Sequence, residues 1–170
     1  MSSNPENVAT RTLIKEAGFY LAKDFKRIND QLKSVQEEVD QQIKSQIAEV
    51  NEATSKIASL NEKIQMAELT GGTANDERDR RGLLLKELGN KINIKYAENV
   101  AGQVNVSAGD SVIFVNGYDS INLEVHSSPE RKGKREGNLD IYTRSSAEGI
   151  PFVVTKQIQG GTIGGALDVR

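Results

Sequence analysis

A long stretch near the start of the chain contains almost nothing that would interrupt a helix. Between Ala9 and Glu68 there is no Pro, and Gly18 is the only Gly. Pro lacks a backbone donor and Gly is a poor helix former, so this interval predicts one continuous helix. Its apolar residues recur at alternating spacings of four and three, which is the a/d repeat of a coiled-coil seam. The first part of the seam consists of Leu21, Phe25, Ile28, Leu32, Val35 and Val39.

Beyond Val39 the seam changes register. Ile43 and Ile47 follow at two successive spacings of four, and the repeat then resumes as far as Ile64. Such a stutter unwinds a left-handed supercoil locally, so we expect a nearly straight helix here. The seam has three interpretations: it is filled within the chain, it joins two or three copies, or it is a docking surface in a larger assembly. We expect Leu32→Asp to unfold the long helix against its partner, because it buries an unpaired carboxylate.

Glycines after the long helix predict a reversal of the chain. Gly71–Gly72 can supply the left-handed backbone of a helix C-terminus, and Asn75 or Asp76 can cap a second helix that runs to about Lys91. Leu84 and Leu88 lie four residues apart on this second helix and give it an apolar face suited to packing on the first. Residues 1–91 are therefore expected to form an αα-hairpin.

From Ile92 onward the apolar period falls to two, which is typical of strands. We expect five or six short, mostly antiparallel strands between residues 92 and 159, and a Gly-rich return into a helix over residues 160–170. The polar segment 127–138 predicts a surface loop. The candidate strands are 92–96, 104–107, 111–115, 121–125, 139–144 and 151–158. The predicted fold class is α+β, in which a long coiled-coil-like helix and its antiparallel partner carry a small β region.

Composition excludes several classes of function. The 22 basic and 24 acidic residues give a net charge of −2, so no strong field favours nucleic acid or an anionic membrane as partner. Cys is absent, which removes disulfides and thiolate metal sites, and only 36% of residues are hydrophobic, which argues against a large globular core. The segment Met1–Asn7 has neither the basic nor the apolar block of a secretory signal, and no apolar run reaches the roughly 20 residues of a membrane span.

The groups that could carry chemistry have structural interpretations. His126 is the only His, so it cannot form a multi-His metal site. The charged segment Asp76–Arg81 begins a helix, where Arg78 and Asp79 can make paired contacts across the hairpin. The glycines Gly160–Gly165 lack the Lys-Ser/Thr pair of a phosphate loop and predict a close strand-to-helix turn. No catalytic residue, metal or cofactor is predicted, and the basic cluster at 131–135 is expected to be a solvated loop.

Three segments resemble one protein family. Asn4-Pro5, with Arg11 and the helix through Leu21–Phe25, is similar to the entry into that family's long helix. Thr73–Arg81 followed by Leu83–Leu88 resembles its Asp-x-Arg-Asp motif. The sequence at 160–170 resembles its Gly-Gly-x-Leu-Gly-Gly-Leu-Leu-x-x-Arg segment. The family is that of the first bacterial flagellar hook-associated protein, which joins hook to filament. One departure is Ala74 and Asn75, where members usually have two Leu, so the packing at this helix start is expected to differ.

The resemblance implies a central fragment of a structural flagellar protein, an adapter at the hook–filament junction that acts by subunit packing. It implies export without a cleaved signal and an extracellular location. The implied partners are copies of the chain itself and neighbouring hook and filament-junction proteins, with an export chaperone held by regions outside this segment. The implied structural or interface residues are Arg11, Leu21, Phe25, Ile28, Leu32, Val35, Val39, Arg78, Asp79, Gly160, Gly161, Gly164, Gly165 and Arg170.

A rival interpretation uses the same heptads differently. A coiled-coil binding or adhesion module, or a secretion-associated chaperone, would oligomerise through the seam or hold a peptide on it. It predicts a stable oligomer in dilute solution. A glycan-cleaving enzyme built on Asp140 and Glu148 is a third alternative, although no aromatic sugar-binding cleft is evident.

Overall fold

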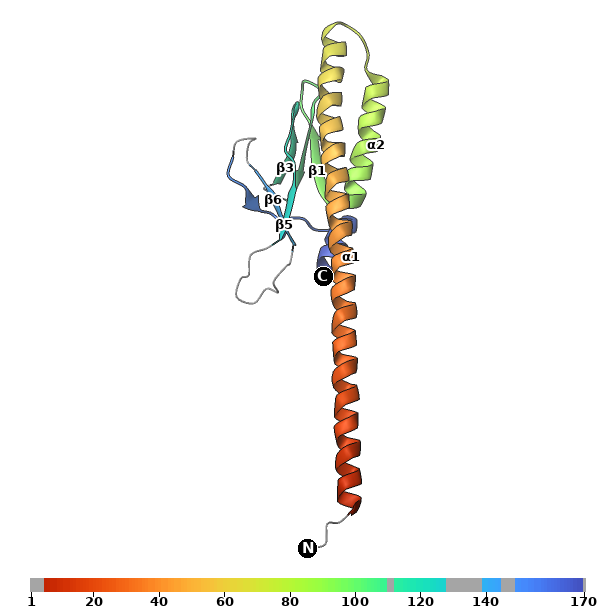
Figure 1. Cartoon of the computed structure of the whole chain (residues 1–170). Helices are drawn as coiled ribbons and strands as arrows, with labels where there is room; N and C mark the ends of the chain where they lie inside the picture. Colours follow the sequence, from red (N-terminus) through yellow and green to blue (C-terminus); the bar gives the residue numbers. More distant parts are fainter. Residues whose placement is uncertain (1–4, 110–111, 128–138, 145–148, 170) are drawn as a thin grey trace. The chain divides into compact units, whose positions relative to one another are not determined.

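The computed structural model of the chain describes residues 5–109, 112–127, 139–144 and 149–169 (Figure 1). These residues form three helices and seven strands, and every strand pairing among them is antiparallel. The predicted α+β fold class is confirmed. The chain divides into two units, Met1–Val39 and Asp40–Arg170, which are described separately below as unit 1 and unit 2.

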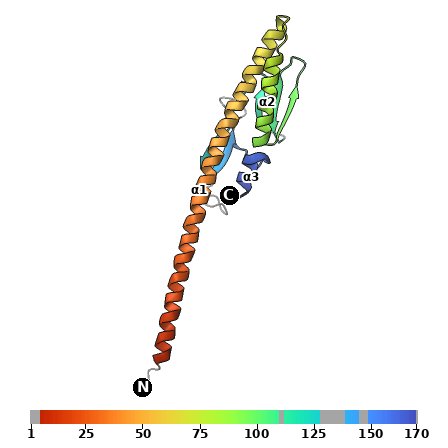
Figure 2. The same ribbon diagram turned by 90° about the vertical axis from the view of Figure 1, so that its right-hand side faces the viewer.

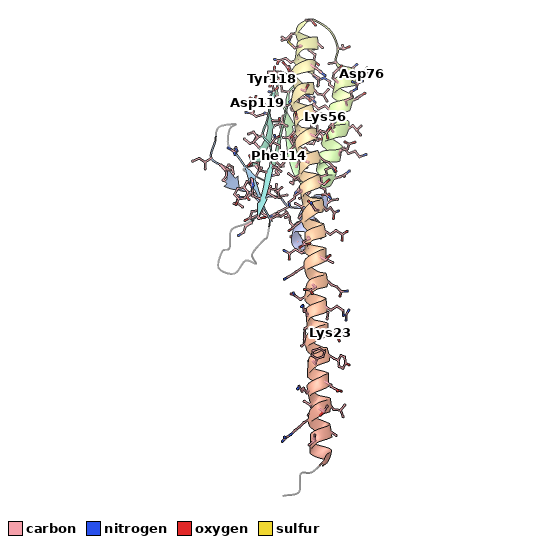
Figure 3. The ribbon with its side chains drawn as sticks, viewed as in Figure 1. Lys23, Lys56, Asp76, Phe114, Tyr118 and Asp119 are labelled. Carbon is pink, nitrogen blue, oxygen red and sulfur yellow. The ribbon has the colours of Figure 1, made fainter. Side chains whose placement is uncertain are left out.

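The first helix, α1, spans Pro5–Leu69 and crosses the boundary between the units. It begins slightly earlier than predicted, at a Pro, which is tolerated in the first turn because that backbone N–H would have no helical partner. Unit 1 is formed by the first part of this helix. Figure 3 draws its side chains, Lys23 among them, projecting from the ribbon around the helix.

In unit 2 the chain reverses after α1 and returns as α2, Asn75–Lys91 (Figure 1). Gly71 has a φ of 80°, and the next residue, Gly72, donates its N–H to the Ala67 carbonyl at 2.9 Å. The cap predicted at Asn75 or Asp76 does not form. Ala74 occupies the N-cap position without a side-chain hydrogen bond, and Asp76 lies in the first turn, where a carboxylate favours the helix dipole.

Two antiparallel sheets follow α2. The first has the order β1-β2-β3-β4, and the second has the order β5-β6-β7. Their bounds are β1 Ile94–Glu98, β2 Val104–Ala108, β3 Val112–Asn116, β4 Asp119–Ser120, β5 Glu124–Ser127, β6 Leu139–Thr143 and β7 Phe152–Val153. The register between β2 and β3 shifts after Val106, and this bulge allows the consecutive residues Phe114 and Val115 both to be buried.

The strand predictions were partly wrong. The predicted strand 121–125 lies later, as β5, and only Phe152–Val153 of the predicted strand 151–158 is extended in a sheet. The remainder turns back on itself, because the Gln157 and Ile158 N–H groups both donate to the Val154 carbonyl. A short strand that was not predicted, β4, follows β3. The basic cluster at 131–135 and nearly all of the surface loop predicted at 127–138 lie outside the described residues.

The core of unit 2 combines the later part of α1 with the sheets. Ile43, Val50, Ile57 and Ile64 on α1 are fully buried, and so is Phe114 on β3. Along β2, buried Val and Ala alternate with half-buried Asn and Ser, so one face of the first sheet is apolar. The last helix, α3 (Gly161–Val169), packs against α2, and Figure 2 shows it near the end of that helix.

Candidate functional site

The guanidinium of Arg81 on α2 makes three hydrogen bonds within unit 2. Its side chain is only 4% exposed. Nη1 donates to Asn61 Oδ1 on α1 at 2.9 Å and to the Gly102 carbonyl at 2.6 Å, and Nη2 donates to Glu98 Oε1 at 3.2 Å. A buried guanidinium requires several acceptors, and here they come from α1, β1 and the β1–β2 turn. Arg81 therefore connects both helices to the first sheet.

Arg78, one helical turn earlier, forms a second and more exposed bridge. It donates to Glu68 at the end of α1, at 3.0 Å from Nε and 2.7 Å from Nη2, and to Glu98 on β1 at 2.5 Å. The hydrogen bond from Arg78, supported by the charge of Arg81, holds the pKa of Glu98 below its usual value. The two carboxylates in turn raise the pKa of Arg78. The prediction of a contact across the hairpin by Arg78 agrees with this geometry, and the contact also extends to β1.

Two Asn side chains attach α1 to the β region in the same manner. Asn61 Oδ1 accepts the Val104 N–H at 3.0 Å, and its Nδ2 donates to the Val104 carbonyl at 2.9 Å and to the Gly117 carbonyl at 2.6 Å. Asn51 makes the equivalent pair with Leu123, at 2.8 and 2.9 Å. In each pair the side-chain amide bonds to the backbone N–H and C=O of one residue, as a neighbouring strand would.

The turns at these contacts use glycine. Gly102 has a φ of 76°, and a Cβ there would lie 3.0 Å from Arg78 Nη2 and 3.2 Å from Glu68 Oε2. Gly117 has a φ of 62°, and its N–H donates to Asn105 Oδ1 at 2.8 Å. The absence of a side chain at Gly102 therefore allows the arginine pair to lie directly over the β1–β2 turn.

The glycines at the start of α3 allow a backbone approach to the end of α2. Gly161 has a φ of 61°, and a Cβ there would overlap the Lys91 carbonyl group and lie 2.7 Å from the Ile92 nitrogen. A Cβ at Gly164 would lie 2.9 Å from the Gln159 carbonyl carbon, whereas one at Gly165 would meet nothing within 4 Å. The close turn predicted for Gly160–Gly165 is therefore required at Gly161 and Gly164 and not at Gly165.

The apolar seam residues of unit 1 are mostly exposed to solvent. Leu21, Phe25, Ile28, Leu32 and Val35 are exposed by 46–64%, and Val39 is half-buried, whereas the later seam residues from Ile43 onward are buried. The expectation that Leu32 is buried against a partner helix within the chain is therefore wrong. The exposed residues keep the predicted a/d spacing and form a continuous apolar stripe on α1, here called the unit 1 stripe.

The other residues that the sequence analysis discussed have the following positions in the structure. Asp79 is exposed and makes no ion pair with another described residue. The polar contacts that α2 makes across the hairpin therefore come from Arg78 and Arg81. Arg11 is exposed, and Arg170 lies outside the described residues. His126 is an exposed residue of β5 that lies 3.0 Å from Glu124 Oε2 and edge-on to Tyr142.

The sequence interpretation missed Asn51, Asn61 and Arg81. Asn61 lies four residues after Ile57 and three before Ile64, which places it on the apolar face of α1. A polar residue at such a position must find partners, and that spacing is the signal that could have identified it.

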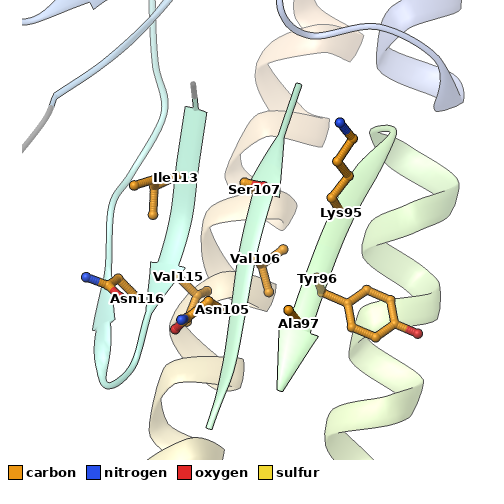
Figure 4. Close-up of a pocket in the computed structure, with 9 residues that line it drawn as sticks. All are labelled: Lys95, Tyr96, Ala97, Asn105, Val106, Ser107, Ile113, Val115 and Asn116. Carbon is orange, nitrogen blue, oxygen red and sulfur yellow. The ribbon is translucent and has the colours of Figure 1, made fainter. Parts of the chain in front are cut away.

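A shallow hollow of about 310 Å³ lies on the first sheet (Figure 4). Its lining includes Lys95, Asn105, Ser107 and Ile113 and contains no carboxylate, so it offers no acid–base pair. Among the described residues there is also no group of three His, Cys, Asp or Glu placed to hold a metal ion, and no helix long and apolar enough to cross a membrane.

A family model described as the flagellar hook-associated protein FlgK helical domain matches residues 1–170. The chain belongs to the FlgK helical-domain family. The resemblance inferred from the three motifs is thereby confirmed.

Individual relatives agree with this assignment. The chain is 26% identical over 171 residues to flagellar hook-associated protein 1 of Salmonella typhimurium, covering 99% of the chain and 30% of the relative. It is 25% identical over 115 residues to the protein of the same name from Bacillus subtilis, covering 68% of the chain and 23% of the relative. The solved structure of the flagellar hook junction protein FlgK from Burkholderia pseudomallei superposes with a TM-score of 0.71 at 25% identity, covering 81% of this chain and 24% of that one. This FlgK helical domain thus spans less than a third of these relatives.

Proposed function

We propose that the chain is a structural segment of a flagellar protein at the hook–filament junction and that it acts by packing against neighbouring subunits. The family match supports the flagellar part of this proposal. The packing part is carried by the unit 1 stripe, because five large apolar side chains stay exposed along one face of a helix. A contiguous apolar stripe of this kind on an exposed helix is typical of a protein–protein contact.

The finer points of the proposal concern partners and place. The partners are further copies of the protein and adjoining hook and filament-junction proteins, and the location is the extracellular flagellum, reached without a cleaved signal. The chain has no catalytic role in this proposal. Three polar side chains support that assignment, because Arg81, Asn51 and Asn61 direct their hydrogen bonds to the protein's own backbone and side chains.

The test is made in the bacterium that carries the gene. Phe25→Lys with Leu32→Lys places two charges on the unit 1 stripe, and we expect filaments to be lost from hooks while the variant protein is still exported. The matched control is Lys26→Gln with Lys33→Gln, which alters two neighbouring residues away from the stripe in the heptad and should leave filaments attached. Electron microscopy of flagella and immunoblots of the culture medium give both readouts. Normal filaments on the stripe variant would contradict the proposal.

The rival function, a coiled-coil module that oligomerises on its own, makes a different prediction from the same exposed stripe. It requires a stable dimer or trimer of fixed size at low micromolar concentration. The proposed function expects weak association that rises steadily with concentration. Light scattering over a concentration series separates the two.

A further inference from the structure

The turn between β3 and β4 contains the only Asn-Gly sequence in the chain, Asn116-Gly117. Asn116 pairs with Asp119 across the turn, so Gly117 and Tyr118 form a two-residue hairpin loop. Gly117 has a φ of 62° and the φ of Tyr118 is not positive, which is the pattern of a type II′ turn. This turn type favours Gly at its first position, so the fold itself places a Gly directly after Asn116.

An Asn followed by Gly is the sequence in which deamidation is chemically easiest, because Gly has no side chain to hinder the attack. The backbone nitrogen of the Gly attacks Cγ of the Asn, and the new C–N bond closes a succinimide ring. The side-chain nitrogen leaves as ammonia, with the proton that the attacking nitrogen gives up. Water then opens the ring at Cγ to give Asp, or at the main-chain carbonyl to give an isoaspartyl linkage. The reaction therefore requires only the two residues and water.

In the folded chain both backbone groups of Gly117 are hydrogen bonded. Its N–H donates to Asn105 Oδ1 at 2.8 Å, and its carbonyl accepts from Asn61 Nδ2 at 2.6 Å. Asn61 is fully buried on α1, and Figure 4 shows Asn105 on β2, beside the strand that carries Asn116. The two partners come from two other elements, so these contacts exist only when α1, β2 and β3 are packed together.

The hydrogen bond to Asn105 opposes the first chemical step. To attack, the Gly117 nitrogen must lose its proton and approach Cγ of Asn116, whereas the hydrogen bond directs that N–H at Asn105. An amide oxygen is too weak a base to remove the proton, so the contact does not assist the attack. Ring closure also brings the Gly117 nitrogen close to eclipsing Cβ of Asn116, which the extended backbone of β3 prevents. The hydrogen bond must therefore break before the ring can close.

We propose that Asn116-Gly117 is a latent deamidation site, which the hydrogen bond from Gly117 to Asn105 keeps unreactive while the chain is folded. This inference goes beyond the proposed function and does not depend on what packs against the chain. Asn105 is a positioning residue, because it holds the attacking N–H and provides no atom to the product. An isoaspartyl linkage would add one carbon to the main chain before Gly117 and would move its carbonyl away from Asn61, so modification would detach the turn from α1.

The test follows Asn116 by peptide mass spectrometry while the whole chain is incubated at mildly alkaline pH, where the attacking nitrogen loses its proton more readily. Deamidation replaces the side-chain NH2 by OH, and fragmentation of the peptide locates the mass change. We expect Asn116 to deamidate about fivefold faster in Asn105→Ala than in the unmodified chain, because the barrier no longer includes the loss of a hydrogen bond. Ser107→Ala is the matched control and should keep the unmodified rate, because Ser107 is also half-buried on β2 but pairs with Ile113, away from the turn.

A second control separates the loss of this contact from a loss of stability. Ile43→Ala destabilises unit 2 by opening a cavity in its core and leaves the Gly117 hydrogen bonds in place. It should deamidate at the rate of the unmodified chain. Equal rates for Asn105→Ala and the unmodified chain would overturn the proposal. An Ile43→Ala rate as high as that of Asn105→Ala would also overturn it, because the reaction would then proceed through unfolding of the whole unit.

Hydrogen exchange tests the contact in the unmodified chain, and therefore decides the matter even if Asn105→Ala fails to fold. The Gly117 N–H lies in a two-residue loop, so its protection reports on the hydrogen bond to Asn105. We expect this N–H to exchange as slowly as the paired N–H groups of β2 and β3. Exchange at the rate of an unstructured chain would overturn the proposal, and so would deamidation of Asn116 as fast in the folded chain as in the chain unfolded in urea.

Discussion

Asn61 pairs with Val104 through both ends of its side-chain amide, which accepts the Val104 N–H at 3.0 Å and donates to the Val104 carbonyl at 2.9 Å. The amide is fully buried, and its Oδ1 also accepts a hydrogen bond from Arg81. One side chain on α1 thereby fixes the first residue of β2, while Asn51 does the same for Leu123, just before β5. The β region is attached to the helix by specific polar contacts as well as by apolar packing.

Removing the Asn61 amide should be costly. Asn61→Ala leaves the Val104 N–H and carbonyl and one Arg81 donor without their partner, so we expect a loss of about 3 kcal/mol in the free energy of unfolding. Urea denaturation monitored by circular dichroism measures this loss. Asn90→Ala is the matched control, because Asn90 is exposed on α2 and should change stability by less than about 0.5 kcal/mol. A loss of less than 1 kcal/mol for Asn61→Ala would show that the buried amide is replaced by water at no cost.

Arg78 and Arg81 on α2 should differ in their contribution to stability although both bond to Glu98. Arg81→Ala removes a buried guanidinium with its three hydrogen bonds and leaves the Gly102 carbonyl without this donor, so we expect a loss of about 3 kcal/mol. Arg78 is about one-third exposed, and its ion pairs are screened by solvent, so Arg78→Ala should cost about 1 kcal/mol or less. Equal losses of unfolding free energy for the two variants, measured by urea denaturation, would contradict the larger stabilising role of Arg81.

Acid should weaken the contact between α2 and β1 through Glu98. Its pKa is lowered in the folded chain by the hydrogen bond from Arg78 and by the charge of Arg81, so the folded state favours the ionised form. The resulting stability is fully present above the ordinary Glu pKa of about 4.3 and is lost as the pH falls through the lowered folded value. Glu52 and Glu124, whose pKa values are also lowered, act in the same direction.

The Glu98 contribution is isolated by comparing pH profiles. The urea midpoint of the unmodified chain should fall between pH 5 and pH 3, and Glu98→Gln should reduce that fall while lowering the midpoint at pH 7. Parallel profiles for the two proteins would contradict a role of Glu98 in the acid sensitivity.

Gly161 and Gly165 of α3 should respond in opposite ways to substitution by Ala. Gly161→Ala places a Cβ onto the Lys91 carbonyl group at a φ of 61°, so we expect a loss of more than about 2 kcal/mol, measured as a drop in the urea midpoint. Gly165→Ala meets nothing within 4 Å in a helical position, so it should gain about 0.5 kcal/mol. If Gly161→Ala were neutral, the tight junction between α2 and α3 would not form as described.

Local patterns in the sequence predicted the helices more accurately than the tertiary contacts. The lack of any Pro after Pro5, and of any Gly but Gly18, before Gly71 defines α1, and the 4-3 spacing defines its apolar face, because helix formation and facing depend on near neighbours. Burial along that face depends on which segments cover it, and heptad spacing carries no such information. This is why Leu32 and Ile43 look equivalent in the sequence but differ in exposure, at 60% and 0%.

The polar contacts that join the parts were the least predictable. Arg81 lies in a charged segment where three acids and three bases compete for partners, and its acceptors are 17–21 residues away in sequence. The predicted bounds of the strands differ from the observed ones for a related reason. In the β region, short alternating stretches fit several registers, and the bulge at Phe114 shifts the pattern by one residue.

Apolar seam residues on α1 should therefore differ in their response to mutation. Ile43→Ala opens a cavity in the core of unit 2, and we expect a loss of about 3 kcal/mol in its unfolding free energy. Leu32→Ala removes an exposed side chain and should change it by less than about 0.5 kcal/mol at low concentration, where copies are apart. At high concentration the Leu32 variant should lose association instead of stability. Urea unfolding of both variants at micromolar concentration and sedimentation at millimolar concentration measure the two effects, and a large loss of stability in dilute Leu32→Ala would mean that the unit 1 stripe is covered within the chain.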